Sequence, residues 1–495
     1  MSLILSYCGF ILPLGIFIWY IWHYFRRQAE PPGPTCFPII GYPQLLQFDK
    51  QFDILEKLAK TYGEIFQVYI GQRRTVVLNS AQAMKEAFKL NQMARRPKNM
   101  LHQVMVEGGE RSLTMANGEE WRTNRKIAVR ALGLFSTSRN ARLEKSVQQG
   151  VDWLISVWKE NEGKPLAIKE TVMNCTGAIM ASILFGRQSS PDDEALKKLF
   201  SLMSKLFENL GLVMMLSDYF PALHFVSKAQ RDKSIANVKT FVDYVMDYMS
   251  RYEPNEQVET IADCLCKVAA DSKKDGETGL TYSGDDVRRI CIDLFDAGFF
   301  TTSENLEWIL LILAVKQDLQ KELQKEIDTV VPADRPPSLQ EDSSRLILTQ
   351  AIVLETLRQV SNVGLGLPHE TEVETEIKGY IIREGTDVLP NLWLINRDPE
   401  VFKEPEKFDP YRFILPDGGL NYALAENVHA FSYGKRRCPG ESLAKQNLMM
   451  LTANLVKTFH FTLDPDSAPK DPLAPREQGF GLKSVQIHKL IFKSR

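Results

Sequence analysis

Apolar residues recur at spacings of three and four over most of residues 51–330, with few Gly or Pro to interrupt them. This spacing gathers apolar side chains on one face of a helix, so it predicts a mostly helical region. Short runs bounded by turn residues predict strands instead. We expect long helices at residues 286–316, 346–360 and 441–458, and short strands near residues 66–70, 75–78 and 379–385.

These elements predict a mainly α fold with a small β portion. The chain has 495 residues, more than an ordinary domain needs, yet we find no internal repeat or low-complexity tract. Residues 398–410 are punctuated by proline and are expected to form a loop. We therefore expect one large globular domain over residues 46–495.

The first segment of the chain differs from the rest. Residues 3–25 contain no Asp, Glu, Lys or Arg, and about 20 apolar residues are enough to cross a bilayer as a helix. Arg26 and Arg27 follow, and basic residues mark the cytoplasmic side. A cleaved signal peptide is the alternative, but the segment lacks a basic start and a small-residue cleavage site. We expect a single transmembrane anchor at residues 1–26.

A proline-rich segment follows the predicted anchor. Pro31, Pro32 and Pro34 fall within four residues, which excludes the interior of a helix or sheet. Residues 27–45 are therefore expected to form a stiff, extended linker that holds a cytosolic catalytic domain near the membrane.

Charge and cysteine content exclude several classes of protein. Sixty basic residues nearly balance 62 acidic ones, so nothing indicates nucleic-acid binding. The seven cysteines are scattered and odd in number, which argues against a disulfide framework and favours a reducing compartment. Cys264 and Cys266 lie too close together for the usual structural zinc pair, and we expect them to be core thiols.

One cysteine stands in an unusual setting. Cys438 follows Arg436 and Arg437 and precedes a helix expected to begin near Glu441. Cations and a helix N-terminus both stabilise a thiolate over a thiol. A thiolate held in this way suits an iron ligand that pushes electron density toward bound oxygen. Gly434 and Gly440 would permit a tight loop against a flat partner.

The same segment resembles a known family. It matches the pattern Phe-x-x-Gly-x-Arg-x-Cys-x-Gly of the cytochrome P450 family, and three other motifs follow the order of that family. With the predicted anchor and the linker, the chain resembles a member from the endoplasmic reticulum. The matching residues are Phe431, Gly434, Arg436, Cys438 and Gly440, then Glu355-Thr-Leu-Arg358, Pro410-Tyr-Arg412-Phe413 and Trp121-Arg-Thr-Asn-Arg125.

The resemblance implies a cofactor and its binding residues. The cofactor is haem b, with the Cys438 thiolate as axial ligand and metal ligand, held in a loop that includes Phe431, Gly434 and Gly440. Arg125, Arg436 and His369 would contact the haem propionates, with Trp121 packed beside them. Glu355, Arg358 and Arg412 would form a buried structural cluster that stabilises the cysteine loop.

The resemblance also implies partners and a location. Electrons would come from NADPH through NADPH-cytochrome reductase, cytochrome b5 is a further candidate partner, and the protein would be single-pass in the endoplasmic-reticulum membrane. The resemblance further implies that a basic face docks the acidic reductase. The alternative is that these charges form only a solvated stripe on the surface. The face comprises Arg122, Arg125, Lys126, Arg130, Lys435 and Arg437.

The segment over residues 296–304 resembles the oxygen-binding helix of the family, in which an acid followed by threonine delivers protons. Thr301 matches the alcohol, but Phe300 occupies the position of the acid. Asp296 and Glu304 lie four residues to either side of Phe300 and share its helical stripe. We hypothesise that one of them, or a water chain reached through Thr301, replaces the missing acid.

Apolar segments are expected to form the pocket, which suits a small lipophilic substrate such as a steroid, fatty acid, terpenoid or xenobiotic. Phe299, Phe300 and Phe480 would make the pocket aromatic. A haem-thiolate isomerase or dehydratase and a non-catalytic haem protein remain as alternatives to a monooxygenase. The expected walls are residues 100–115, 207–225, 295–301, 363–367 and 479–482.

Overall fold

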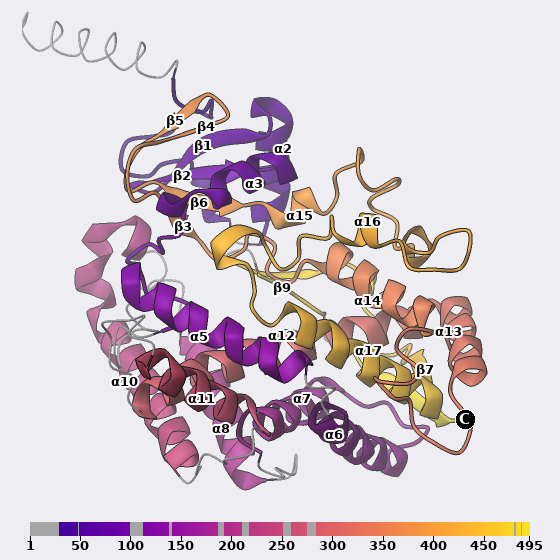
Figure 1. Cartoon of the computed structure of the whole chain (residues 1–495). Helices are drawn as coiled ribbons and strands as arrows, with labels where there is room; N and C mark the ends of the chain where they lie inside the picture. Colours follow the sequence, from indigo (N-terminus) through magenta and orange to yellow (C-terminus); the bar gives the residue numbers. More distant parts are fainter. Residues whose placement is uncertain are drawn as a thin grey trace, which may run out of the picture.

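The computed structural model describes residues 29–47, 49–99, 112–137, 141–186, 193–209, 217–250, 259–274, 284–479, 482–486 and 488–495. The predicted anchor at residues 1–26 lies outside the described residues. Within them the fold is mostly helical with small sheets, as predicted, and it divides into a sheet-containing corner and a larger helical part (Figure 1).

The helices carry most of the molecule, and the long ones fall close to the predicted positions. Residues 286–316, for example, were expected to be one helix, and the structure has α12 at Gly284–Val315. The others are α2 (Gln51–Tyr62), α3 (Ala81–Lys89), α5 (Gly118–Thr137), α6 (Ala141–Glu160), α7 (Lys169–Phe185), α8 (Glu194–Asn209), α10 (His224–Ser250), α11 (Ile261–Lys274), α13 (Gln317–Val330), α14 (Ile347–Val360), α15 (Leu392–Ile395), α16 (Tyr422–Ala425) and α17 (Glu441–Thr458), with 3₁₀ turns η1 (Pro43–Leu46), η2 (Asn91–Met93), η3 (Pro221–Leu223), η4 (Pro410–Phe413) and η5 (Gly434–Arg436).

The strands form one four-stranded sheet of order β1-β2-β6-β3 and three two-stranded sheets, which pair β10 with β7, β4 with β5, and β8 with β9. In the larger sheet β2 pairs parallel to β6 although they are far apart in the sequence. The strands are β1 (Ile65–Ile70), β2 (Arg73–Leu78), β3 (His369–Glu370), β4 (Thr375–Ile377), β5 (Tyr380–Ile382), β6 (Asp387–Pro390), β7 (Phe459–Leu463), β8 (Arg476–Gly479), β9 (Leu482–Ser484) and β10 (Leu490–Ser494).

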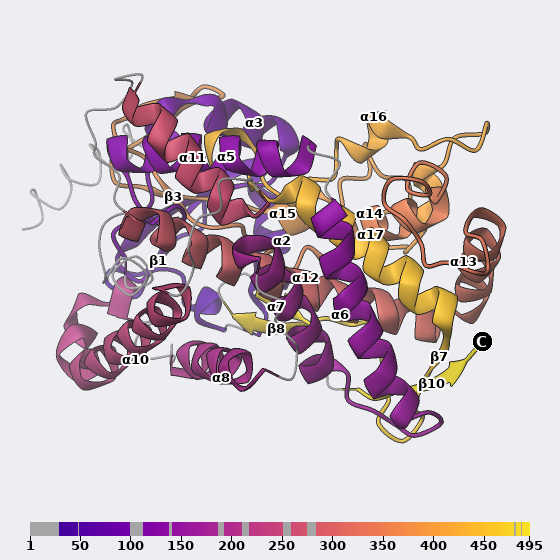
Figure 2. The ribbon, with the colours of Figure 1, turned by 60° about the horizontal axis from the view of Figure 1, so that its bottom comes forward.

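Helix α12 forms the centre of the helical part, with α7, α14 and α17 packed against it (Figure 1). Its last part, residues 308–315, is apolar on all sides, which is typical of a helix buried in the core of a large protein. Residues Arg289–Val315 are long and apolar enough to cross a membrane, but most of this stretch is buried inside the molecule. Helices α8 and α10 lie side by side at one edge (Figure 2).

The described part of the predicted linker packs against the sheet corner. The Gln67 amide donates to the Pro32 carbonyl at 2.8 Å, and the Ile381 amide donates to the Ala29 carbonyl at 2.7 Å. A Cβ on Gly33 would lie 1.9 Å from the Gln67 carbonyl oxygen. This segment therefore docks on β1 and β5 rather than spanning open solvent.

Candidate functional site

A cavity of about 240 Å³ opens between the helical part and the segment that carries Cys438. Its wall comes from α5, α12, the loop before β3 and residues 431–440, which we call the cysteine loop. Segments from distant parts of the sequence therefore meet around one space. The predicted site residues on this wall are Trp121, Arg125, Thr301, His369, Phe431, Arg436 and Cys438.

The backbone fixes the cysteine loop. The Cys438 amide donates to the Phe431 carbonyl at 3.0 Å and closes the loop. Gly434 has a φ of +76°, and a Cβ there would lie 2.2 Å from the Phe88 carbonyl oxygen, so only glycine fits. Gly440 differs, because its φ of −92° suits any residue and nothing crowds it. The backbone therefore requires Gly434 but not Gly440.

The Cys438 side chain is exposed to the cavity. Enclosure by protein raises the pKa of its thiol, while a hydrogen bond from the Gly440 amide and the charge of Arg125 act in the opposite direction. The amide belongs to the N-terminal end of α17, where free N–H groups favour negative charge. A bound metal cation would deprotonate the thiol outright. The loop thus presents a sulfur ligand into an enclosed space.

Three guanidinium groups gather on one wall of this cavity, from Arg96, Arg125 and Arg436. Burial lowers the pKa of Arg96 to about 9 and that of Arg436 to about 8, and a neighbouring arginine adds repulsion in each case. No acidic neighbour among the described residues offsets these effects. Because guanidinium groups keep their proton in proteins, the lowered pKa values indicate buried cations that an anion would stabilise.

Trp121 completes the cationic wall. The Arg436 guanidinium lies 3.8 Å from the centre of the Trp121 ring and donates to the Ala94 and Ala116 carbonyls at 2.7 and 2.6 Å. The indole Nε1 of Trp121 is buried and has no hydrogen-bond partner among the described residues. This indole N–H and the three cations would bind carboxylates at the edge of a flat group. The exposed thiol would bind a metal carried by the same group. The residues present therefore fit haem.

His369 lies on the same wall at the start of β3. Its ring stacks on Phe88 with centroids 3.9 Å apart, and its Nδ1 lies 2.6 Å from the Met93 carbonyl oxygen. Burial and then the nearby arginines hold the pKa of His369 well below its usual value. The ring is therefore neutral and carries its proton on Nδ1, since a carbonyl only accepts. Contact of His369 with a propionate stays a prediction.

Arg96 is a cavity residue that the sequence analysis missed. Its Nη1 donates to the Leu367 and Pro368 carbonyls, both at 2.8 Å. The adjacent Arg95 takes a different partner and pairs with Glu370 at 3.0 Å. Two neighbouring arginines in an irregular segment look alike in the sequence, so only the fold separates their roles.

Glu355, Arg358 and Arg412 meet in one buried cluster. Arg358 donates to both carboxylate oxygens of Glu355, at 2.7 and 2.8 Å, and both side chains are fully buried. The Arg412 Nε lies 3.3 Å from Glu355. None of the three lines the cavity, so their influence on it must pass through other residues.

Asn396 connects this cluster to the cysteine loop. Its carbonyl accepts from Arg358 at 2.9 Å, and its side-chain oxygen accepts from the His429 amide at 2.8 Å. The His429 carbonyl in turn accepts from the Ser432 amide at 3.0 Å. A short run of hydrogen bonds therefore joins the buried ion pair to the loop that carries Cys438.

On α12, Thr301 faces the cavity, and its hydroxyl donates to the Ala297 carbonyl at 2.7 Å. The other two predicted catalytic residues, Asp296 and Glu304, do not line the cavity. The prediction put both residues on the helix stripe that contains Phe300. Successive residues of a helix point about 100° apart, so the stripe of Phe300 and the stripe of Thr301 face different directions. The stripe of Phe300 is therefore not the stripe that faces the cavity, and a catalytic role for Asp296 or Glu304 stays a prediction.

Asp293 is the acidic side chain that reaches the cavity wall among the described residues. Its carboxylate accepts from the Ser112 hydroxyl at 2.8 Å and from the Leu113 and Thr114 amides at 2.5 and 3.0 Å. The Thr114 carbonyl lies 3.3 Å from Arg436. Asp293 thus ties α12 to a segment that positions the cationic wall, a contact that no local pattern predicts.

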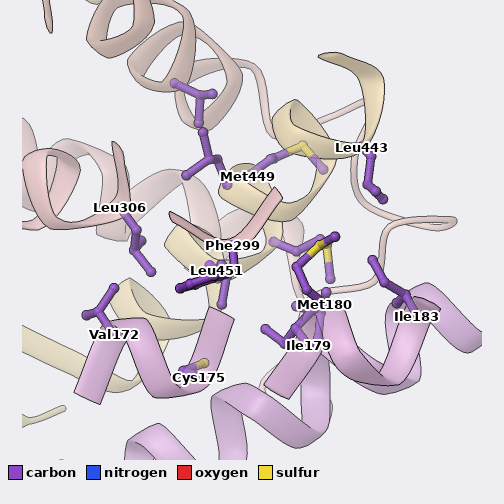
Figure 3. Close-up of a cluster of buried hydrophobic side chains, with 14 of the residues drawn as sticks. Val172, Cys175, Ile179, Met180, Ile183, Phe299, Leu306, Leu443, Met449 and Leu451 are labelled. Carbon is purple, nitrogen blue, oxygen red and sulfur yellow. The ribbon is translucent and has the colours of Figure 1, made fainter. Parts of the chain in front are cut away.

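The prediction that Phe299 and Phe300 line the pocket is wrong. Phe299 is fully buried, with its ring 5.1 Å from that of Phe200, and it points into the core near Met180 (Figure 3). Phe300 does not line the cavity, and a Cβ on Gly298 would meet Met180 rather than open space. Val363 and Leu367 do lie on the wall. Of the expected wall segments, residues 100–111, 210–216 and 480–481, which include Phe480, lie outside the described residues.

The predicted basic face is partly assembled. A groove of about 710 Å³ runs beside α5 and shares Trp121 and Arg125 with the cavity wall. Positive charge dominates it, although Glu372 also contributes. The cationic side chains that line it are Arg95, Lys98, Arg122, Arg125, Lys126, Arg130 and Lys435.

Comparison with known proteins places this site in context. A family model described as Cytochrome P450 matches residues 31–490. Cytochrome P450 1A1 from Canis lupus familiaris is 29% identical over 454 residues, which cover 88% of this chain and 86% of that protein. The same enzyme from Pleuronectes platessa is 30% identical over 472 residues, covering 92% and 89%. Cytochrome P450 2C3 from Oryctolagus cuniculus is 30% identical over 461 residues, covering 91% of each chain.

Proposed function

The chain belongs to the cytochrome P450 family and is an oxidoreductase of the monooxygenase class, and from this premise we propose that it inserts one oxygen atom from dioxygen into a small lipophilic substrate. Steroids, fatty acids, terpenoids and xenobiotics are the candidate substrates. The observation that carries the proposal is the Cys438 thiol, exposed to an enclosed cavity beside three buried guanidinium groups. When bound, haem with a thiolate ligand supplies the activation of dioxygen.

Each wall of the cavity has its own task in this proposal. Cys438 would hold the haem iron through its thiolate, and the loop residues Phe431, Gly434 and Gly440 hold the cysteine in place. Arg96, Arg125 and Arg436, with the Trp121 N–H, bind and orient the propionates, and His369 contributes once a bound propionate stabilises a second proton on its ring. Thr301 holds a proton at its hydroxyl oxygen on the opposite, α12 side. Glu355, Arg358 and Arg412 keep the cysteine loop rigid.

The proposed organisation keeps the predicted domains. Residues 1–26 anchor the chain in the endoplasmic-reticulum membrane, residues 27–45 connect, and residues 46–495 form the cytosolic catalytic domain. NADPH-cytochrome reductase supplies electrons through the basic face beside α5, and cytochrome b5 is a second candidate donor. Docking there is supported by the excess of positive charge in the groove, which favours an acidic partner.

A labelling experiment tests the monooxygenase reaction. The full-length protein, the reductase and NADPH are incubated in lipid vesicles with a panel of lipophilic compounds under isotopically labelled dioxygen. We expect a product with one labelled oxygen atom, formed only when NADPH and the reductase are both present. Label from water instead of dioxygen, or product without NADPH, would refute the proposal.

Phe300 supports a second candidate function. It replaces the acid that relatives with a full dioxygen cycle are expected to carry, so a haem-thiolate isomerase or dehydratase would tolerate it. Such an enzyme rearranges a peroxide substrate without external electrons. Turnover of a lipid hydroperoxide in the absence of reductase, together with no NADPH-dependent product, would establish this function.

A further inference from the structure

Three buried polar atoms lie on one face of α12 without a hydrogen-bond partner among the described residues. They are the Glu304 Oε2, the Asn305 Oδ1 and the Trp308 Nε1. The three residues are at most 5% exposed. Residues 304 and 308 are one helical turn apart and residue 305 adjoins both. Buried polar atoms in proteins are normally bonded, by ordered water where no side chain serves. This face is therefore suited to hold water.

One end of this face reaches the cavity. Asn305 lines the cavity wall, and its Nδ2 donates to the Thr301 carbonyl at 2.8 Å. Thr301 is also on the wall, one turn earlier. The unpartnered oxygen of Asn305 thus lies beside the threonine to which protons must be delivered.

The other end reaches the surface. Lys169, at the first position of α7, brings its Nζ within 3.7 Å of the Glu304 carboxylate. The Lys169 side chain is 55% exposed, whereas that of Glu304 is 5% exposed. This ion pair therefore connects the solvent to the interior of the protein. Glu304 in turn is adjacent to Asn305 along the helix.

The surrounding groups favour a mobile proton at this place. Burial raises the pKa of Glu304 and raises that of Glu307 to about 7, and repulsion between the two carboxylates adds to the second shift. Lys169 opposes both shifts, and the Val485 amide bonds the Glu304 carboxylate. Two buried carboxylates beside one ammonium group can share a single proton near neutral pH.

We propose that Lys169, Glu307, Glu304 and Asn305 line a water-filled passage that carries protons from the surface to Thr301, in place of the acid missing at Phe300. The proposal rests on the monooxygenase function. Per turnover, two electrons from NADPH and two protons from solvent convert dioxygen into one oxygen atom in the product and one in water.

The first test looks for the passage itself and does not depend on turnover. A high-resolution crystal structure of the haem-bound protein should show ordered water that bridges the Glu304 and Asn305 oxygens. Infrared spectra of the same protein should show a carboxylic acid band that titrates near neutral pH and disappears in Glu307→Gln. Dry packing between these oxygens, or no such band, overturns the proposal.

The second test measures coupling in Glu304→Gln, Glu307→Gln and Asn305→Leu, with Glu170→Gln as the control because Glu170 is an exposed acid beside Lys169. Positioned proton donors contribute about 10²–10⁴-fold to a rate, so we expect product per NADPH to fall at least about tenfold in the first three. The lost electrons should appear as hydrogen peroxide. The isosteric glutamine variants keep the test decisive if Asn305→Leu fails to fold.

Two controls separate this proposal from the function on which it rests. Each variant should keep the reduced carbon-monoxide spectrum of the unaltered protein, and the two glutamine variants should also keep its substrate affinity. If the unaltered protein forms no NADPH-dependent product, the monooxygenase function fails. If it forms product and the glutamine variants match it in product per NADPH, the passage alone fails.

Discussion

The cationic wall shows at the scale of single residues how the cavity selects its ligand. Arg96, Arg125 and Arg436 carry charges that burial makes unfavourable, and Trp121 adds an N–H with no partner among the described residues. Leaving a buried donor unpaired costs about 1–3 kcal/mol. In the haem-free protein these buried charges and the N–H therefore destabilise the wall. The two carboxylates of a bound haem would pair with them and remove this cost.

Trp121→Phe tests the indole N–H without removing the ring that covers Arg436. A hydrogen bond to a charged group contributes about 1.5–3 kcal/mol, so we expect haem to dissociate roughly ten- to a hundredfold more readily. The haem-free protein should unfold at the same denaturant concentration or a slightly higher one. Haem transfer to apomyoglobin measures the first quantity, and an unchanged transfer rate would contradict the assignment.

Glu307→Gln tests the buried carboxylate through pH. The pKa of Glu307 is raised from 4.5 to about 7 in the folded protein. Between these values the folded protein binds more protons than the unfolded chain, so this group lowers stability as pH rises. Glutamine cannot ionise, so the variant should match the unaltered protein near pH 4.5 and exceed it by about 3 kcal/mol at pH 8.

Denaturant unfolding at several pH values, with Glu170→Gln as the exposed control, measures this difference. Parallel stability curves for Glu307→Gln and the unaltered protein would contradict the raised pKa. The curves must be compared in the haem-bound state throughout, since ligand binding itself adds to stability.

The sequence predicts the residues of the cysteine loop well because their order along the chain is itself the pattern. It does not predict Arg96 or Asp293, whose importance comes from contacts across about 180 residues or more, such as Asp293 with Ser112 and Arg96 with Leu367. Their neighbours in sequence give no sign of these contacts. Long-range packing decides which of two adjacent arginines faces the cavity.

At the scale of elements, periodicity predicts where helices lie better than which side faces a site. The predicted helix at residues 286–316 agrees with α12 to within two residues at each end. The same periodicity put Asp296 on the stripe of Phe300, which faces away from the cavity. A helix packed against α7, α14 and α17 is buried on most sides, so its sequence pattern does not reveal the one side that borders a cavity.

Helix α14 and turn η4 test how a buried ion pair supports the loop. In Glu355→Ala, Arg358 becomes an unpaired buried cation, which costs about 3–5 kcal/mol. The matched control is Glu56→Ala, which breaks the exposed i,i+4 pair with Lys60 and should cost at most about 1 kcal/mol. Thermal unfolding and haem content measure both variants, and similar losses in the two would contradict the role of the cluster.

At the scale of the whole molecule, the N-terminal segment joins the predicted anchor to the body. Residues 29–47 pack on the sheet corner, yet Phe37, Ile39 and Ile40 of this segment remain exposed. The sheet that receives them pairs β2 with β6 across about 310 residues. Strand patterns predict such strands singly, but they cannot predict which distant strand each one joins.

Deletion of residues 1–28 tests the anchor. Because the shortened chain keeps the docking contacts that the structure describes, from Ala29 onward, it should fold and bind haem normally. It should be released from membranes by high salt or mild detergent, whereas the full chain should resist both. Flotation with lipid vesicles measures the difference, and equal behaviour of the two chains would contradict a transmembrane anchor.

Binding of haem iron by the Cys438 thiolate is tested by the spectrum of the carbon-monoxide complex. The reduced protein is mixed with carbon monoxide, and the difference spectrum is compared between the unaltered protein and Cys438→Ala, with Cys175→Ala as a buried-cysteine control. We predict the band characteristic of thiolate-ligated haem in the unaltered protein and the control, and its loss in Cys438→Ala. The same band in Cys438→Ala, or no haem in the unaltered protein, would contradict the account.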